Sequence, residues 1–263
     1  MKFIILLSIL SLTPLLASTQ TIADEAIPHA HSHNDYLKKN PLWGALENGC
    51  SSIEIDVFAH EESLKVAHVG IALKKRKTIQ ELYILPLISY LSQNEWVYQN
   101  QSLVLMIDFK TSGEKTLPLL LELIKPYQDY FTYAQSDSIV YRPLQLVISG
   151  KGFSYEMIKE LNKVYVFVDG SIQHCNNNYP NILIERASAK YGSIFSWKGK
   201  KEMPESDKEE LQRLVAISKT CNTKLRFYAM PENENIWRTF LDAGVYWINV
   251  DNSKRFRKFF EKP

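Results

Sequence analysis

The sequence predicts an α/β protein, a closed (β/α)8 barrel of parallel strands with helices outside it. Three observations support this fold class. The chain has 263 residues, and barrels of this class typically use about 250 as one domain. Short apolar runs alternate with stretches of helical apolar spacing, which indicates βαβ units and a parallel sheet. No glycine-rich phosphate loop follows the first expected strand, which disfavours an open nucleotide-binding sheet.

The elements can be assigned in order along the chain. We expect strands at residues 28–33, 51–58, 103–109, 144–149, 164–168, 193–197, 224–230 and 245–250. We expect helices at residues 42–47, 79–91, 116–127, 155–162, 206–219, 234–243 and 255–260. The connection from Gly170 to Tyr191 has the weakest pattern and contains an Asn-rich turn at residues 176–178. Without internal repeats or linkers, residues 25–263 are expected to form one domain.

The amino terminus has the pattern of a secretory signal peptide. Lys2 precedes an apolar run from Phe3 to Leu16, and the small residues Ala17 and Ser18 follow it. The run is shorter than the roughly 20 apolar residues that a membrane span needs. We therefore expect a signal peptide over residues 1–20, a secreted or periplasmic protein, and no stable membrane span after its removal.

The charge balance excludes a strongly basic surface. Lys and Arg number 31 and Asp and Glu 29, which gives a net charge of +2. A nucleic-acid partner is therefore not expected. Nothing in the sequence indicates an oligomeric state.

The cysteines do not form a recognisable framework. Cys50, Cys175 and Cys221 are an odd number with no close pairing, so neither a zinc motif nor a disulfide set can be assigned. Three buried thiols are the favoured interpretation, and one bridge with one free thiol is the alternative.

Carboxylates alternate with apolar residues on two of the expected strands. On residues 51–58, Ser52, Glu54 and Asp56 share one face, because successive side chains of a strand point to opposite sides. Residues 103–110 repeat the pattern with Asp108 and Lys110. Buried charge is costly unless it is paired or binds a metal, and hard cations prefer oxygen ligands. We therefore expect one divalent cation, Ca²⁺ or Mg²⁺, at the barrel mouth.

Histidines flank these carboxylate strands. His33 ends the first expected strand, and His68 ends the short apolar run of residues 64–69. Imidazole titrates near neutral pH, so two histidines beside a metal can act as general base and general acid. His29 and His31 lie on the same side of the strand as His33, but deeper in the barrel.

Further residues at strand ends are expected to contact a substrate. They are Trp197, Arg226, Tyr228 and Asp251, because barrel sites lie at the carboxyl ends of the strands. Barrel filling explains the aromatic residues equally well, and Asp251 could instead cap the last helix. The charge run at residues 74–77 is either a solvated loop or an attraction for phosphate.

An ordered set of motifs resembles one superfamily. The set begins with HSHNDY at residues 31–36, SIEIDV at 52–57, LKVAH at 64–68 and MIDFK at 106–110. RPLQLVISGK at 142–151, FVDG at 167–170, LRFYAMPEN at 225–233 and GVYWINVDN at 244–252 follow. The chain resembles the phosphatidylinositol-phospholipase-C-like phosphodiesterases, which include glycerophosphodiester phosphodiesterases. Within them it is most similar to the group named after altered inheritance of mitochondria protein six.

The resemblance implies a site as well as a barrel of that type. It implies that His33 and His68 are catalytic and that Glu54, Asp56 and Asp108 bind the metal. Asn34 matches an asparagine that ligates calcium in eukaryotic phospholipases, and Lys110 matches a basic residue near the phosphate. The His-Arg-Gly of glycerophosphodiesterases is replaced by residues 33–35, His-Asn-Asp, and the usual His-Asp by residues 68–69, His-Val. The substrate is therefore expected to be a small-molecule or lipid-derived phosphodiester of open identity.

The expected function is that of a metal-dependent phosphoric diester hydrolase. It would act on a glycerophosphodiester or phospholipid-headgroup-type substrate, with one histidine as base and the other as acid. One alternative is a zinc hydrolase of the amidohydrolase or polymerase-and-histidinol-phosphatase type, with ligands from His31 and His33, or from His29 and His31, and from Asp251. Zinc favours nitrogen ligands, and few histidines occur on the middle strands. The other alternative is a non-catalytic barrel that binds a phosphorylated headgroup.

Overall fold

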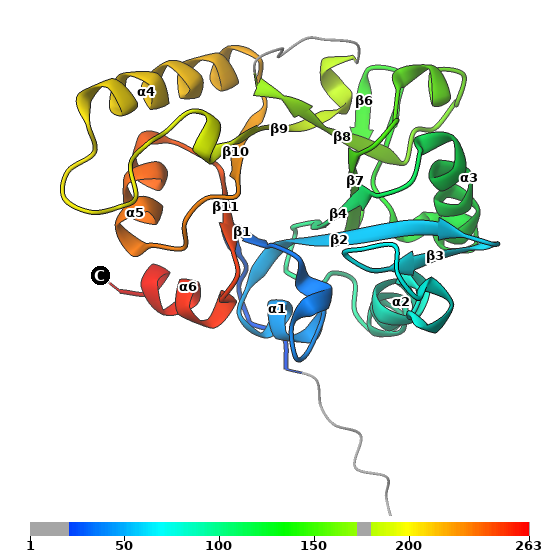
Figure 1. Cartoon of the computed structure of the whole chain (residues 1–263). Helices are drawn as coiled ribbons and strands as arrows, with labels where there is room; N and C mark the ends of the chain where they lie inside the picture. The colour runs from blue at the N-terminus through cyan, green and yellow to red at the C-terminus, as the bar shows by residue number, and fades with distance from the viewer. Residues whose placement is uncertain (1–20, 173–179, 263) are drawn as a thin grey trace, which may run out of the picture.

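The computed structural model describes residues 21–172 and 180–262. Within these residues, eight parallel strands form a closed barrel with helices outside it (Figure 1). The predicted fold class is therefore confirmed. The predicted signal peptide and the Asn-rich turn lie outside the described residues.

The barrel strands follow each other around the ring in chain order. They are β1 (Ile27–Ser32), β2 (Cys50–His60), β4 (Leu103–Phe109), β7 (Leu144–Gly150), β8 (Val166–Ser171), β9 (Ile184–Lys190), β10 (Lys224–Tyr228) and β11 (Trp247–Val250). Pairing of β1 with both β11 and β2 closes the ring. The short β3 (Ser63–Val66) pairs antiparallel with β2 outside the ring. A separate hairpin is formed by β5 (Tyr133–Gln135) and β6 (Ser138–Val140).

Helices cover the outside of most of the ring. They are α1 (Trp43–Glu47), α2 (Leu85–Leu91), α3 (Gly113–Ile124), α4 (Glu205–Thr220), α5 (Glu234–Ala243) and α6 (Ser253–Phe260). A π-helical turn, η3 (Gln80–Ile84), precedes α2. The expected helix at residues 155–162 is wrong, because only the 3-10 turn η5 (Tyr155–Met157) forms there. No described helix is long and apolar enough to cross a membrane.

The sixth strand is also not where the sequence pattern put it. The strand is β9, whereas residues 191–193 form a 3-10 turn and residues 194–197 lead toward α4. Glu185 and Arg186 hide β9 in the sequence, because two adjacent charges resemble a surface loop. Both are buried. Arg186 Nε donates to Glu185 Oε2 at 2.6 Å, and Lys224 Nζ donates to Glu185 Oε1 at 2.9 Å.

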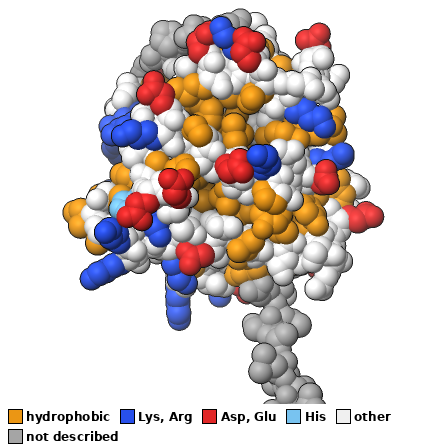
Figure 2. All heavy atoms as spheres, turned by 90° about the vertical axis from the view of Figure 1, so that its right-hand side faces the viewer, with side chains coloured by type: hydrophobic (Ala, Val, Ile, Leu, Met, Phe, Trp, Pro, Cys, Tyr) orange, Lys and Arg blue, Asp and Glu red, His pale blue; other side chains and the backbone are white. Residues whose placement is uncertain are grey.

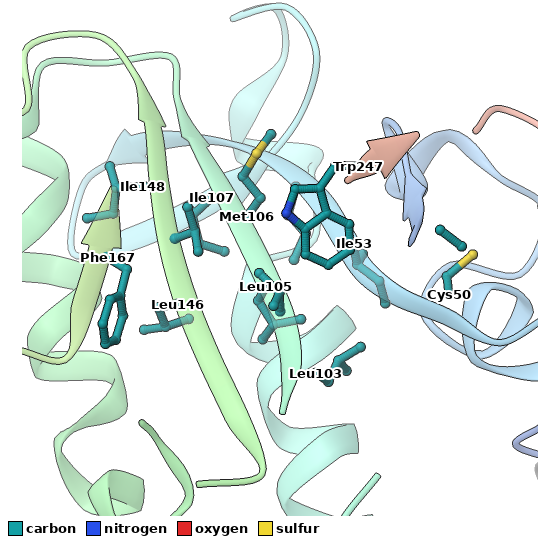
Figure 3. Packing of buried hydrophobic residues seen from close by; sticks show 14 of the residues in the cluster. Cys50, Ile53, Leu103, Leu105, Met106, Ile107, Leu146, Ile148, Phe167 and Trp247 are labelled. Carbon is teal, nitrogen blue, oxygen red and sulfur yellow. The ribbon is translucent and has the colours of Figure 1, made fainter. Parts of the chain in front are cut away.

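The strands present apolar residues to the helices and polar residues to the barrel interior. Ile53 and Ile55 belong to the continuous apolar core, and Figure 3 shows the side chains of β4, β7 and β8 packed together in it. In the interior, the Arg186 guanidinium lies 4.5 Å from the Trp247 ring centroid and contacts Met106 Sδ. The predicted alternation of β2 is confirmed, and it directs two carboxylates inward.

The cysteines follow the less favoured interpretation. Cys50 is a buried free thiol, and Cys221 is disulfide-bonded. The expectation of three thiols is wrong, because a count of cysteines does not show which of them the fold brings within bonding distance. Cys175 lies outside the described residues.

Candidate active site

A cavity of about 570 Å³ lies at the carboxyl ends of the barrel strands. The structure brings eight of the predicted site residues to its walls: His33, Asn34, Glu54, His68, Asp108, Lys110, Arg226 and Tyr228. Three residues are not part of the lining. Asp56 is fully buried and bonds to residues of the wall, Asp251 bonds to His33, and Trp197 lies elsewhere.

Three carboxylates from neighbouring strands converge at one side of this cavity. Asp56 on β2 is in register with Asp108 on β4, and Glu54 lies two residues earlier on β2. Each of the three offers an oxygen within 4.8 Å of the others. Asp56 Oδ1 is buried and has no hydrogen-bond partner among the described residues. An oxygen-only donor set with an unsatisfied buried oxygen can hold a hard cation.

Lys110 contributes positive charge to the same cluster. Its Nζ lies 2.9 Å from Asp56 Oδ2 and also forms an ion pair with Asp108. Burial alone would lower the pKa of Lys110, but the hydrogen bonds to Asp108 and Asp56 raise it above its usual value. Burial raises the pKa of Asp56, against the hydrogen bonds from Tyr36 and Lys110. Lys110 therefore balances part of a negative charge that burial makes costly.

Two hydrogen-bond donors from the barrel interior hold the Glu54 carboxylate in place. Its Oε2 accepts hydrogen bonds from His31 Nε2 at 3.0 Å and from Arg226 Nη2 at 2.8 Å. His31 Nδ1 lies 3.3 Å from Arg186 Nη1 and 2.8 Å from Ser52 Oγ. Because a guanidinium only donates, Nδ1 is an acceptor and Nε2 carries the proton. Burial, with the positive charges of Arg226 and Arg186, lowers the pKa of His31 well below its usual value.

The deeper histidines are thus supporting residues. His31 orients Glu54, while His29 Nδ1 bonds the backbone carbonyl of Tyr246 at 2.8 Å. Neither is part of the cavity lining.

His33 is held by a residue that follows the last barrel strand and by its own neighbour in the sequence. Its Nδ1 lies 2.8 Å from Asp251 Oδ1, and its Nε2 lies 3.0 Å from Asn34 Nδ2. The carboxylate on Nδ1 fixes the tautomer, so Nε2 keeps its lone pair. The hydrogen bond with His33 is the main cause that lowers the pKa of Asp251. The cap of α6 comes instead from Asn252, whose side chain accepts from Arg255 N at 3.0 Å.

His68 has an equivalent arrangement with a different carboxylate. Its Nδ1 lies 3.0 Å from Asp56 Oδ2, and its side chain is 57% exposed. The Tyr36 hydroxyl donates to the same Asp56 oxygen at 2.7 Å and lies 3.1 Å from Asn34 Oδ1. Burial and the hydrogen bond to Asp56 raise the pKa of Tyr36, so the hydroxyl keeps its proton. Tyr36 was missed in the sequence, although it ends the HSHNDY motif.

A second polar group lies across the cavity, and the sequence reasoning missed most of it. Arg226 Nη1 donates to Asp169 Oδ2 at 3.2 Å. Asp169 Oδ1 and Ser188 Oγ are both buried, and a hydrogen bond from the Ser188 side chain acts to lower the pKa of Asp169. Burial is the main cause that raises the pKa of Asp169. Ser149 Oγ donates to Asp108 Oδ1 at 2.7 Å. Asp169 and Ser149 belong to the FVDG and VISGK stretches, which were the available signal.

Trp197 is not brought to this cavity. It lines another cavity, of about 750 Å³, between α4 and α5, and its indole Nε1 donates to the Lys200 carbonyl at 3.0 Å. Its expected position rested on the wrong assignment of the sixth strand.

Comparison with known proteins gives a consistent family. A family model described as AIM6-like phosphodiesterase domain matches residues 19–99 and 97–169. The chain is 36% identical over 266 residues to altered inheritance of mitochondria protein 6 of Saccharomyces cerevisiae strain YJM789, covering 84% of this chain and 68% of that one. It is 28% identical over 263 residues to the homolog of Arthroderma benhamiae, covering 88% of this chain and 83% of that one.

These matches agree with the motifs and with the barrel. The family model extends from the first strand into β8 and so includes both carboxylate strands and both histidines at the cavity. The chain belongs to the AIM6-like phosphodiesterase family.

Proposed function

We propose that this protein is a metal-dependent phosphoric diester hydrolase acting on a glycerophosphodiester or phospholipid-headgroup-type substrate. One observation carries the proposal. Three carboxylates within 4.8 Å of one another are flanked by two histidines of the same cavity, each with its own carboxylate on Nδ1. This combination supplies cation ligands and two proton-transfer groups at one place.

Glu54, Asp56 and Asp108 would hold the cation, with the side-chain oxygen of Asn34 as a further ligand. The unsatisfied Oδ1 of Asp56 is the feature of this chain that best fits such a ligand. Bound there, a divalent ion such as Ca²⁺ or Mg²⁺ would neutralise charge on the phosphate oxygens. His31 and Arg226 would keep Glu54 in place, because both already bond its Oε2.

The two histidines would exchange protons with the substrate. One accepts the proton of the attacking group, which is a water or a hydroxyl of the substrate itself, and the other protonates the leaving alcohol. Asp251 and Asp56 hold the two rings by Nδ1, so each Nε2 is the atom that would exchange the proton, and at His33 the substrate would replace the Asn34 amide that lies 3.0 Å from Nε2. Asp251 therefore has a role different from the expected substrate contact: it orients His33.

The remaining lining fits a phosphate that bears a hydroxylated alcohol. Lys110 would place its positive charge beside the phosphate. Asp169 and Ser188, which both lie in the cavity lining, would bond a hydroxyl of the alcohol. Tyr228, 41% exposed at the cavity edge, adds an aromatic surface to the same side.

The contacts support a zinc hydrolase less well than a phosphodiesterase that uses a hard cation. His31 is already bonded to Ser52 and Glu54, and the candidate metal ligands of the described residues are all carboxylates. Zinc prefers nitrogen and sulfur donors over such a set.

The proposal is tested by turnover of bis-p-nitrophenyl phosphate and a panel of glycerophosphodiesters, with Ca²⁺, Mg²⁺ or a chelator. We expect chelation, His33→Ala and His68→Ala each to abolish turnover. The matched control is His29→Ala, which removes a histidine of β1 outside the cavity and should leave turnover close to that of the parent protein. Full activity with chelator, or in His68→Ala, would contradict the mechanism. Activity restored by zinc alone would favour the zinc hydrolase, and metal binding without any turnover would favour a binding module.

A further inference from the structure

The segment that follows His68 combines exposed apolar residues with a run of cations. We name residues 69–77 the rim loop. Val69 is 50% exposed and Ile71 is 71% exposed. The four consecutive residues 74–77, Lys-Lys-Arg-Lys, are all exposed. None of these four cations has a carboxylate within ion-pair distance among the described residues.

The rim loop is anchored at both ends beside the cavity. His68, immediately before it, lines the cavity wall. Ala67 N donates to the Asp56 carbonyl at 3.2 Å, and Val66 N donates to the Lys77 carbonyl at 3.0 Å. Gly70 packs on the Phe58 ring, which a Cβ at that position would approach to 3.2 Å. The exposed apolar side chains are therefore held at the mouth by a defined backbone.

Exposed apolar residues gather at this end of the barrel. Among the described residues, eight large apolar side chains are exposed. Four of them lie at this end: Leu37 follows β1, Tyr228 ends β10, and Val69 and Ile71 follow His68 of the cavity lining. Ile71 and Leu37, at 71% and 64%, are the most exposed of the eight. Single exposed apolar residues are ordinary, but a group beside one cavity is typical of an interaction surface.

We name the rim loop together with Leu37 the rim, and the chemistry of this surface identifies its partner. Apolar side chains next to a lysine- and arginine-rich segment are the features of a protein surface that lies in the interface of an anionic membrane. A nucleic acid would use the cations but offers no place for Ile71 and Leu37. Figure 2 views the side that carries β3 and α2 and shows lysine and arginine side chains projecting from the surface near its lower left edge.

We propose that the rim docks on an anionic phospholipid bilayer. Leu37, Val69 and Ile71 enter the boundary between headgroups and acyl chains, and residues 74–77 contact the lipid phosphates and carboxylates. In this orientation the cavity faces the membrane. Docking does not depend on catalysis, so it can be present or absent whatever the outcome of the turnover experiments.

The test is co-sedimentation with vesicles of phosphatidylcholine, with and without phosphatidylserine. The chain used starts at Thr21, because all eight barrel strands follow it and the apolar run of residues 3–16 would bind lipid by itself. We expect binding to the anionic vesicles that weakens as salt rises. Lys74→Ser with Lys75→Ser should reduce the binding constant about fivefold for each cation removed. Ile71→Ser should reduce binding even at low salt.

Matched controls lie at the opposite end of the barrel. Lys125→Ser with Lys219→Ser removes the same charge from the carboxyl-terminal ends of α3 and α4, and Leu161→Ser removes an exposed apolar side chain before β8. We expect these variants to bind like the parent chain. A second measurement uses the Ile71→Trp variant, whose fluorescence should shift to shorter wavelength on anionic vesicles. The proposal is overturned by equal losses in rim and control variants, by no binding to anionic vesicles, or by an unshifted fluorescence spectrum of the Ile71→Trp variant.

Discussion

The buried ion pair of Glu185 and Arg186 should make the stability of the barrel depend on pH in acid. Burial alone would raise the pKa of Glu185, but Arg186 and Lys224 outweigh it and hold that pKa at about 2. The ordinary value is 4.5. Because the folded-state pKa lies below that of the unfolded chain, the stabilisation is complete above pH 4.5 and is lost as the pH falls toward 2.

The size of this pH-dependent stabilisation follows from the lowering of the Glu185 pKa. A depression from 4.5 to about 2 corresponds to about 3 kcal/mol of unfolding free energy at neutral pH. By linkage, about 1 kcal/mol of it is lost by pH 4 and about 2 kcal/mol by pH 3. Replacing Glu185 by Gln also leaves Arg186 buried without its carboxylate, which typically costs about 3–5 kcal/mol.

Urea unfolding of the parent protein and of Glu185→Gln, at pH 7, 4 and 3, measures the effect. We expect the variant to be less stable at pH 7 and the difference to shrink by about 2 kcal/mol at pH 3. Other carboxylates titrate in both proteins, so they cancel in the difference. If Glu185→Gln does not fold, Lys224→Gln removes the partly exposed partner and should show the same trend with a smaller amplitude. A difference that stays constant between pH 7 and pH 3 would refute the reasoning.

Three further changes have defined outcomes. Asp251→Asn should lower kcat for bis-p-nitrophenyl phosphate by about 10²-fold or more, because His33 loses its orienting carboxylate; unchanged kcat would contradict this role, and metal affinity by calorimetry should not change. Gly150→Ala should weaken metal binding and lower Tm, because Gly150 has φ +91° and an added Cβ would lie 2.5 Å from Asp108 Oδ1. A variant that binds the metal as tightly as the parent protein would contradict the close packing of Gly150 on Asp108. Asn252→Ala should reduce the free energy of unfolding by about 1 kcal/mol through loss of the α6 cap, measured in urea, with Asn235→Ala as a comparison outside that cap.

The sequence was sufficient for the parts of the site that follow strand periodicity. The alternation on β2 directs Glu54 and Asp56 inward, and the same period on β4 directs Asp108 to meet them. Strand periodicity is local, so it can be read without knowing the partner strands. The motifs then related these residues to two histidines on other segments, and the structure lines one cavity with both.

Periodicity failed where charges are buried. β9 was missed because Glu185 and Arg186 look like surface residues until the fold pairs them inside the barrel. Because the sixth strand was predicted at residues 193–197, Trp197 was expected at the end of a strand. It lies instead between α4 and α5. Burial of a charge depends on a partner distant in the sequence, which a local pattern cannot contain.

By itself, the sequence determined the barrel, the family and the inward face of the carboxylate strands, because these depend on local alternation and on ordered motifs. Only the tertiary structure decided which groups act on each other. Asp251 meets His33 across 218 positions, and Arg226 meets Glu54 across 172. Pairing of β1 with β11 closes the ring and creates the first contact. The second forms because Arg226 on β10 and Glu54 on β2 both point into the barrel interior. The His33–Asp251 hydrogen bond and the Arg226–Glu54 hydrogen bond are therefore consequences of the barrel topology. Each forms only when two strands that are distant in the sequence lie close together in the ring.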